Sequence, residues 1–211
     1  MTGTRYQKAL EVKKPLRDIV ISTVVLFLVC TIVAVSLAFT NAATRDVILE
    51  RTLENENLAR KEVFSTADDF SKIENLESIT AGKDGLSRVK EAYNGTSNGE
   101  KAGRVFLIES NGYGGVIKMA AGIDKDGKIM GVKIIEMNET PGLGSKAKEK
   151  PFISQFGGIN PEEPLAVVKS GKSRDSEINA ISGATITSKA VTEGIQAAID
   201  VNTLLNERGD L

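Results

Sequence analysis

The sequence predicts an α+β protein with an N-terminal transmembrane helix, a helical stalk, and an antiparallel-sheet domain that ends in a helix. The first observation behind this prediction is a long uncharged run from Ile19 to Phe39. The second is a set of β-type segments between residues 104 and 137, and the third is an amphipathic helical pattern near the C-terminal end. Antiparallel strands followed by helices are typical of α+β domains and not of doubly wound parallel sheets.

The uncharged run is long enough to cross a bilayer, because an α-helix needs about 20 apolar residues to span the hydrocarbon core. A cleaved signal peptide is the alternative, but its apolar region is usually only about 7 to 15 residues long. A buried core helix is a second alternative, although such a helix rarely stays apolar on every face over this length. We therefore expect a transmembrane helix within residues 19–43, which anchors the protein in membrane lipid.

Basic residues predict the orientation of this helix, because loops on the cytoplasmic side carry an excess of lysine and arginine. Residues 1–18 are therefore expected in the cytoplasm and the main domain outside it, so that the protein is a single-pass protein of the cell (inner) membrane. The basic residues before the span are Arg5, Lys8, Lys13, Lys14 and Arg17, whereas Arg45 and Arg51 follow it closely.

Composition excludes several classes of function. One cysteine and no histidine rule out a Cys-ligated iron–sulfur cluster, a Cys/His zinc site and catalysis that needs a histidine base. The 27 basic residues are balanced by 28 acidic residues, and the segment after the span is acidic, so a nucleic-acid surface is not expected. Cys30 lies within the span and is expected to pack there as a small apolar residue.

Residues 44–99 are expected to form the stalk and a connecting segment. Apolar residues recur at helical spacing among many charges up to about residue 65, which predicts an amphipathic helix. The stretch from Asp68 to Gly99 is polar, and its end, Asn94 to Gly99, is expected to be a turn-rich loop.

The domain over residues 100–211 begins with three expected strands, Arg104–Glu109, Gly115–Asp124 and Lys128–Met137, in an antiparallel meander. The Asp-Gly pair at residues 126–127 is a strong hairpin signal between the second and third strands.

A glycine-rich loop, Glu139 to Gly144, follows the strands, and a short helical piece is expected around Lys146 to Phe156. A strand is then predicted at Leu165–Val168. The last helix is predicted with one apolar face, made of Val191, Ile195, Ala198, Ile199, Asn202 and Leu205.

The turn before the last helix, Asn179 to Ser188, is rich in small and hydroxyl residues. One interpretation is a plain strand-to-helix turn, with Gly183 for tight backbone geometry and Thr187 or Ser188 as a helix cap. The other is a phosphate site, because the start of a helix offers free N–H groups and partial positive charge. The residues by themselves leave both interpretations open.

Two motifs resemble one known family. The sequence Ser182-Gly183-Ala184-Thr185 resembles the flavinylation motif of the FMN-binding domain in the G subunit of Rnf electron-transport complexes and in the C subunit of Na⁺-translocating NADH:quinone oxidoreductases. The Glu139 to Gly144 loop resembles the glycine-rich loop of the Rnf protein, and the single N-terminal span agrees with it. The resemblance covers essentially the whole chain.

The resemblance implies that FMN is attached covalently, through its phosphate, to the hydroxyl of Thr185. The residues of the Glu139 to Gly144 loop are by themselves equally compatible with a plain turn at Pro141, whereas the resemblance implies that both motifs line the flavin site. Leu143 would cover a face of the flavin ring, Glu139 and Thr140 would offer polar contacts, and Lys146 would either help to neutralise the phosphate or remain a solvated surface lysine. The full set expected at the cofactor comprises Thr185, Ser182, Gly183, Ala184, Thr187, Ser188, Glu139, Thr140, Leu143, Gly144 and Lys146. No catalytic residue and no metal site are expected.

The function implied by the resemblance is that of a membrane-anchored electron carrier within an ion-translocating ferredoxin:NAD oxidoreductase, which has no turnover of its own. Its expected partners are the other membrane and peripheral subunits of the Rnf complex and an FAD-dependent FMN transferase for maturation. One alternative is the C subunit of the Na⁺-translocating quinone reductase, or a free-standing extracytoplasmic flavin carrier. An alternative of a different class is a non-redox anchored binding or assembly domain.

Overall fold

The computed structural model describes the backbone of residues 3–209 and the side chains of residues 17–209. The chain divides into two compact units, Met1–Thr52 and Leu53–Leu211. The basic residues predicted to flank the span on its N-terminal side, from Arg5 to Lys14, lie outside the residues whose side chains are described.

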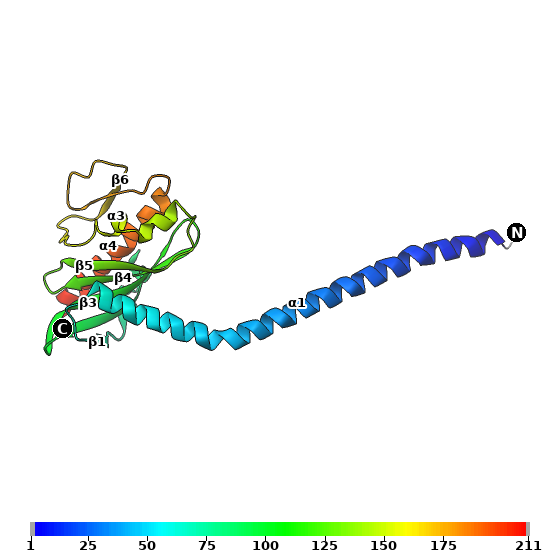
Figure 1. The fold of residues 1–211 in the computed structure, drawn as a ribbon, viewed down its shortest axis with the longest axis horizontal. Coiled ribbons are helices and arrows are strands. Elements are labelled where there is room, and N and C mark those ends of the chain that lie inside the picture. The colour runs from blue at the N-terminus through cyan, green and yellow to red at the C-terminus, as the bar shows by residue number, and fades with distance from the viewer. Residues whose placement is uncertain (1–2, 210–211) are drawn as a thin grey trace. The chain divides into compact units, whose positions relative to one another are not determined.

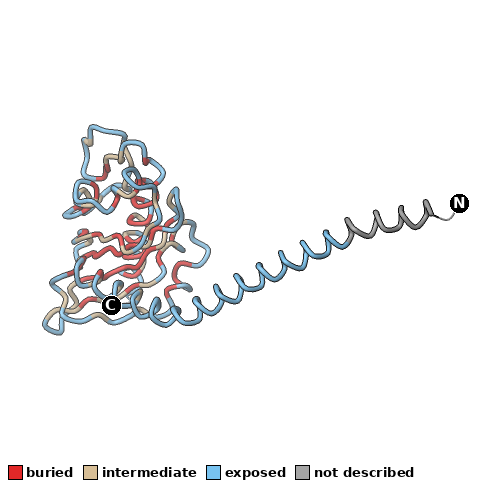
Figure 2. The backbone as a smooth tube through the Cα atoms, turned by 45° about the vertical axis from the view of Figure 1, so that its right-hand side comes forward, coloured by how far each residue is buried: buried red, intermediate tan, exposed pale blue. Residues whose placement is uncertain are grey.

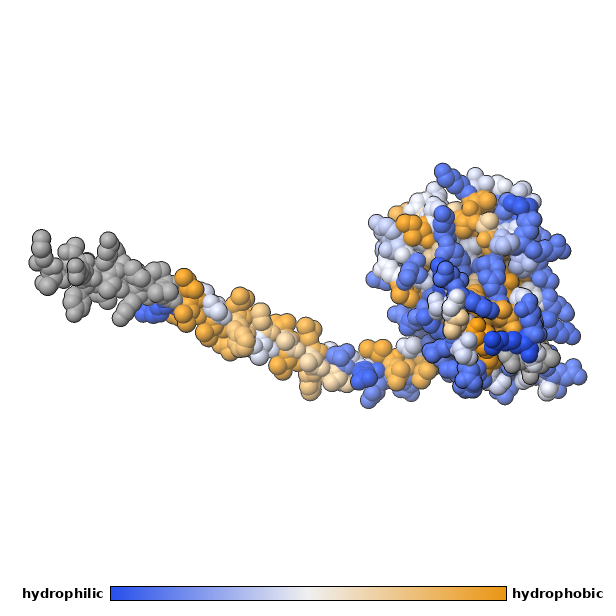
Figure 3. Space-filling model, turned by 180° about the vertical axis from the view of Figure 1, so that it is seen from behind, coloured by the Kyte–Doolittle hydropathy of each residue, from blue (hydrophilic) through white to orange (hydrophobic). Residues whose placement is uncertain are grey.

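The described residues of the first unit belong to helix α1 (Gly3–Val63), and the last residues of this helix are part of the second unit. Figure 3 shows a long apolar stretch in the described part of this helix, with hydrophilic residues before and after it. No other part of the described chain covers these apolar side chains, which are exposed. The hydroxyls of Thr23 and Thr31 donate to the carbonyls of Ile19 and Phe27 at 2.9 and 2.8 Å, so the helix satisfies these polar groups internally, as a lipid environment requires. In the described part of the chain this is the one helix long and apolar enough to cross a membrane, which fits a single-pass anchor.

A five-stranded antiparallel sheet forms the centre of the second unit, with the strands side by side in chain order (Figure 1). The strands are β1 (Asp69–Lys72), β2 (Val89–Ser97), β3 (Glu100–Asn111), β4 (Val116–Asp124) and β5 (Ile129–Glu136). The prediction of an antiparallel meander is confirmed for β3, β4 and β5. The β4–β5 turn contains the expected Asp126-Gly127 pair, and the carboxylate of Asp124 caps it by accepting from the N–H groups of Asp126 and Lys128 at 2.9 and 2.8 Å.

The sheet begins earlier than the sequence predicts, because β1 and β2 lie in the stretch expected to be a polar connection. The expected loop from Asn94 to Gly99 is mostly strand: residues up to Ser97 belong to β2, and only Asn98 and Gly99 form the turn. These two residues have φ angles of 52° and 82°, which is the geometry of the two-residue Asn-Gly hairpin. A helix, α2 (Leu76–Thr80), and a 3₁₀ turn, η1 (Leu86–Arg88), connect β1 to β2.

The two faces of the sheet are covered by different helices. Helix α4 (Thr185–Glu207) packs on one face, where the main hydrophobic core of the domain lies. As predicted, the buried face of α4 includes Val191, Ile195, Ala198, Asn202 and Leu205. The end of α1 covers the other face through Ala59, Val63 and Phe64, which pack on Val105, Leu107 and Ala120. Figure 2 shows the buried residues concentrated in the strands and in α4.

Between β5 and α4 the chain forms short elements: η2 (Gly144–Lys148), α3 (Lys150–Ile153), β6 (Ala166–Val168) and β7 (Glu177–Asn179). The helical piece expected from residue 146 to residue 156 is thus two short pieces. Strands β6 and β7 pair in parallel, apart from the main sheet. Strand β7 leads directly into the turn before α4, so its position determines where that turn lies.

Candidate functional site

Three segments that are far apart in the sequence line one cavity of about 600 Å³. These segments are the β3–β4 connection, the glycine-rich loop after β5, and the start of α4. The residues that line the cavity are Tyr113, Glu139, Thr140, Leu143, Gly144, Gly183, Ala184, Thr185, Ile186 and Thr187. A cavity of this size lies within the range of about 300 to 1,000 Å³ that is usual for cofactor and small-molecule sites.

The start of α4 presents unused hydrogen-bond donors to this cavity. The first bond of the helix joins the Ser188 N–H to the Ala184 carbonyl at 3.0 Å, so the N–H groups of residues 185–187 have no acceptor within the helix. Ala184 is the N-cap and makes no side-chain cap. The interpretation of Thr187 or Ser188 as the cap is therefore wrong, because both lie inside the helix. The open helix start is suited to a phosphate group.

Thr185 is the first residue of α4, and its side chain is exposed at the cavity. Among the described residues none makes a hydrogen bond with its hydroxyl. The preceding Gly183 has a φ angle of 75°, a conformation that glycine adopts without strain, and a Cβ there would lie 3.2 Å from Leu143 Cδ2. The turn therefore leaves the Thr185 hydroxyl accessible from solvent and from the cavity.

Apolar side chains form the walls of the cavity. Three large apolar residues that line the cavity are exposed: Tyr113 by 72%, Leu143 by 44% and Ile186 by 54%. A group of exposed large apolar residues at one place is unusual and points to a binding site. Such a wall is suited to a flat aromatic ligand, because burying apolar area is favourable. Tyr113 and Ile186 were not expected from the sequence; the glycines at positions 112, 114 and 115 were the available signal for the first.

Glu139 connects the three segments. Its Oε1 accepts from the N–H groups of Tyr113 and Gly114 at 2.8 and 3.2 Å, and its Oε2 accepts from the Thr187 hydroxyl at 2.9 Å. The Thr187 side chain is 1% exposed, so this hydroxyl lies inside the wall. Both oxygens of the carboxylate therefore accept hydrogen bonds from the protein itself.

Three residues of the expected set do not line the cavity, namely Ser182, Ser188 and Lys146. Ser188 is fully buried; its hydroxyl donates to the Ala184 carbonyl and accepts from the Ile181 N–H, both at 2.9 Å. The role of the Ser188 hydroxyl is structural, since its two hydrogen bonds stabilise the turn before α4. Lys146 is exposed and lines a separate hollow of about 250 Å³ with residues 179–181.

Side-chain contacts at both ends fix strand β7, which leads into the turn before α4. The Gln155 amide bonds both backbone groups of Asn179, accepting from its N–H at 2.8 Å and donating to its carbonyl at 3.2 Å. At the other end of the strand, hydrogen bonds from Ser173, together with the Arg174 guanidinium, lower the pKa of the buried Glu177 to about 2. These contacts fix the segment that leads into the turn before α4.

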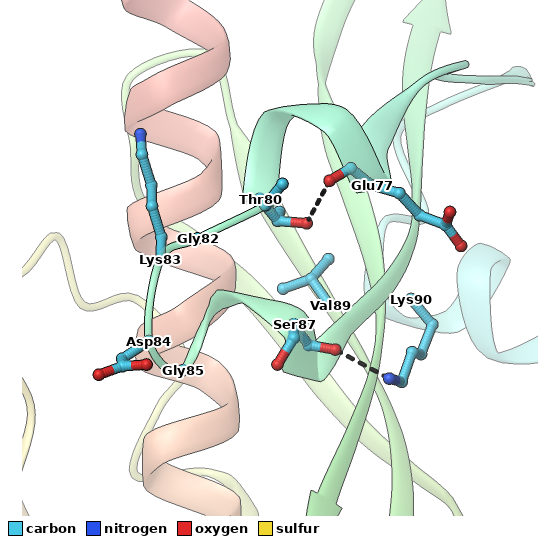
Figure 4. Close-up of a pocket in the computed structure, with 10 residues that line it drawn as sticks. Glu77, Thr80, Gly82, Lys83, Asp84, Gly85, Ser87, Val89 and Lys90 are labelled. Carbon is cyan, nitrogen blue, oxygen red and sulfur yellow. Dashed lines mark hydrogen bonds between the residues drawn. The ribbon is translucent and has the colours of Figure 1, made fainter.

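Another hollow, of about 490 Å³, lies at the α2–η1 loop (Figure 4). Lys90 Nζ donates to the Ser87 carbonyl at 2.9 Å, and the Thr80 hydroxyl lies 3.4 Å from the Glu77 carbonyl. In Figure 4 the charged side chains around this hollow point in different directions and do not converge. The cavity at α4 is therefore the stronger candidate, because its polar groups and apolar walls face one space.

Comparisons with known proteins agree with this choice. The FMN-binding domain family matches residues 112–200, a range that includes all three segments of the cavity. The G subunit of the Na(+)-translocating ferredoxin:NAD(+) oxidoreductase complex of Acetobacterium woodii is 40% identical over 183 residues, which cover 84% of this chain and 88% of that protein. The G subunit of the proton-translocating complex of Clostridium ljungdahlii is 33% identical over 175 residues, covering 83% and 86%.

Among solved structures, NqrC of Shewanella oneidensis has a similar fold, with a TM-score of 0.50 and 18% identity. The match covers 71% of this chain and 74% of that chain. This likeness supports the assignment of the fold alone.

Proposed function

Because this chain belongs to the G-subunit family of ion-translocating ferredoxin:NAD(+) oxidoreductase complexes, we propose that it is a membrane-anchored electron carrier that holds covalent FMN at Thr185. The observation that carries this proposal is the position of the Thr185 hydroxyl. It lies at an open helix start and beside a cavity with apolar walls. The protein has no turnover of its own and acts as a redox component of the whole complex.

The residues present fit FMN. The unused N–H groups of residues 185–187 and the positive end of the α4 dipole suit its phosphate. Tyr113, Leu143 and Ile186 offer apolar surface to its ring system. FMN supplies reversible electron uptake, which no side chain of this composition provides. The residues of this chain orient the cofactor, shield part of it from water and set the electrostatic field around it.

Thr185 is the proposed acceptor in maturation by a transferase that uses FAD. Its Oγ forms a bond to the phosphorus of the FMN half, the P–O bond of the FAD pyrophosphate breaks, and AMP leaves. The hydroxyl proton goes to the transferase or to solvent. The product is a phosphodiester, which keeps one negative charge next to the N–H groups at the start of α4. A covalent bond also prevents loss of the cofactor outside the cytoplasm.

Orientation follows from the distribution of basic residues around the span, which favours a cytoplasmic N-terminus. The FMN domain then lies on the outer side of the membrane, where membrane and peripheral subunits of the same complex exchange electrons with it. The two relatives from ferredoxin:NAD(+) oxidoreductase complexes cover most of this chain and favour the Rnf complex over the Na⁺-translocating quinone reductase. They also favour a redox role over a non-redox assembly domain.

The test is mass spectrometry of the full-length protein after co-expression with the transferase. We expect an FMN-sized mass increment on the tryptic peptide Asp175–Lys189, located on Thr185 by fragmentation. Thr185→Val should lose the increment and the in-gel flavin fluorescence completely. Thr203→Val is the matched control, because Thr203 is also an exposed threonine of α4 and should leave flavin attachment unchanged. An increment that persists in Thr185→Val would refute the acceptor assignment, and no increment in the wild-type protein would refute covalent FMN.

A further inference from the structure

The carboxylate of Glu139 is a junction between three segments, with each oxygen already bonded inside the protein. Oε1 accepts from the N–H groups of Tyr113 and Gly114 at 2.8 and 3.2 Å, and Oε2 accepts from the Thr187 hydroxyl at 2.9 Å. Tyr113 and Gly114 belong to the β3–β4 connection, and Thr187 to the first turn of α4. One side chain thus links three walls of the cavity.

Two glycines make room for this junction. A Cβ on Gly112 would lie 2.1 Å from Glu139 Oε1, and a Cβ on Gly144 would lie 2.5 Å from Glu139 Oε2 and 2.8 Å from Thr187 Oγ1. All three distances are far below van der Waals contact, so no side chain fits at either position without moving the carboxylate. The glycines on the two loops therefore serve the close approach of backbone to Glu139.

We propose that Glu139 is a positioning residue, which holds the three walls of the FMN cavity together before the cofactor is attached and keeps a negative charge beside it afterwards. Only the second part of this inference, the negative charge beside the attached cofactor, rests on the proposed function. Three hydrogen bonds from the protein occupy most of the roughly four acceptor sites of the carboxylate, so the main role of Glu139 is to shape the site. The charge makes electron uptake by a nearby flavin less favourable and so lowers its reduction potential.

Three substitutions separate the hydrogen bonds from the charge. In Glu139→Gln the amide oxygen still accepts both backbone N–H groups, and the NH₂ group donates to the Thr187 oxygen, so the junction is kept and the charge is lost. In Glu139→Ala both are lost. In Thr187→Val the charge and the two backbone hydrogen bonds remain, and only the link to α4 is removed. Glu136→Gln is the matched control, since Glu136 is an exposed glutamate at the end of β5.

The first measurement is hydrogen exchange, followed by mass spectrometry, on the full-length protein in detergent micelles. It is made in the Thr185→Val background, so that no flavin is attached. Exchange in the peptide that contains residues 111–116 should become about tenfold faster in Glu139→Ala, because two N–H groups lose their acceptor. Glu139→Gln and Glu136→Gln should exchange at the parent rate. Equal exchange in Glu139→Ala and its parent would overturn the proposal.

The second measurement uses the full-length flavinylated protein and two flavin signals. Glu139→Gln should raise the flavin reduction potential and leave the fluorescence anisotropy unchanged, because the charge is lost and the walls stay in place. Glu139→Ala should lower the anisotropy and reduce the initial rate of flavinylation about tenfold, since a positioned acceptor turn requires the lost hydrogen bonds. Thr187→Val should lower the anisotropy without raising the potential. Unchanged potential in Glu139→Gln would overturn the role of the charge.

Failure of this proposal and failure of the proposed function give different results. If hydrogen exchange shows the junction but Thr185 carries no FMN in the wild-type protein, the proposed function fails and the claim about the flavin falls with it. If FMN is attached to Thr185 but Glu139→Ala changes neither hydrogen exchange nor anisotropy, the proposed function stands and the positioning role is refuted.

Discussion

Substitution of Ser188 by alanine tests whether the turn before α4 depends on a buried hydroxyl or whether that hydroxyl belongs to the cofactor site. Ser188 is fully buried, and its Oγ accepts from the Ile181 N–H at 2.9 Å while donating to the Ala184 carbonyl at 2.9 Å. The Ala184 carbonyl keeps a second donor, the Ser188 N–H at 3.0 Å. Ser188→Ala therefore leaves one group without a partner, the N–H of Ile181.

The expected cost follows from that single unsatisfied donor. Leaving a buried donor without an acceptor costs about 1 to 3 kcal/mol, and since Ile181 is only partly buried we expect about 1 to 2 kcal/mol. For a domain of this size 1 kcal/mol corresponds to roughly 2 to 4 °C in Tm. Ser188→Ala should therefore lower the Tm of the domain by about 2 to 8 °C, whereas Thr185→Val, at an exposed side chain, should change it by less than about 2 °C.

The assay combines differential scanning calorimetry of the full-length protein in detergent micelles with the peptide mass measurement. We expect Ser188→Ala to unfold at a lower temperature and still carry FMN on Thr185. Thr192→Val is a suitable comparison, because the Thr192 hydroxyl is also buried in α4 but donates only to the Ser188 carbonyl at 2.9 Å. Its Tm should fall by less. A wild-type Tm for Ser188→Ala, or loss of the FMN increment with Thr185 intact, would refute this assignment of Ser188.

Two further predictions concern pH and topology. Glu177 has a pKa of about 2 in the folded protein against an ordinary value of 4.5, so its contribution to stability is complete above pH 4.5 and is lost as the pH falls toward 2. The difference in unfolding free energy between wild type and Glu177→Gln, measured by urea titration, should therefore shrink between pH 5 and pH 2.5, and a constant difference would contradict this origin of the shift. For the topology, Cys30 is the sole cysteine of the sequence, so a Cys30→Ala background allows single-cysteine labelling. A membrane-impermeant maleimide should label Ser65→Cys in intact cells and Thr4→Cys only after permeabilisation; the reverse pattern would invert the orientation.

Much of the fold was predictable because its signals are local. The uncharged run from Ile19 to Phe39 predicts a helix in lipid from composition alone, and the helical spacing of Val191, Ile195 and Leu205 predicts the buried face of α4. The Asp126-Gly127 pair predicts the β4–β5 turn from its own backbone preference. Strands β1 and β2 escaped prediction because they are short or polar and gain their stability from pairing with neighbours in the sheet.

The candidate site, too, was predictable from the sequence only where its residues are neighbours in the chain. The short motif that ends in Thr185 identified the proposed acceptor through its resemblance to a family, because the acceptor hydroxyl and the helix start are neighbours in the chain. The sequence by itself also determined the anchor and excluded a metal centre of cysteine or histidine. Only the tertiary structure decided that Glu139 turns inward, that Ser188 is buried, and that Tyr113 lies at the cavity. The contacts of Glu139 join segments at least 25 residues apart, and local backbone preference carries no information about such contacts.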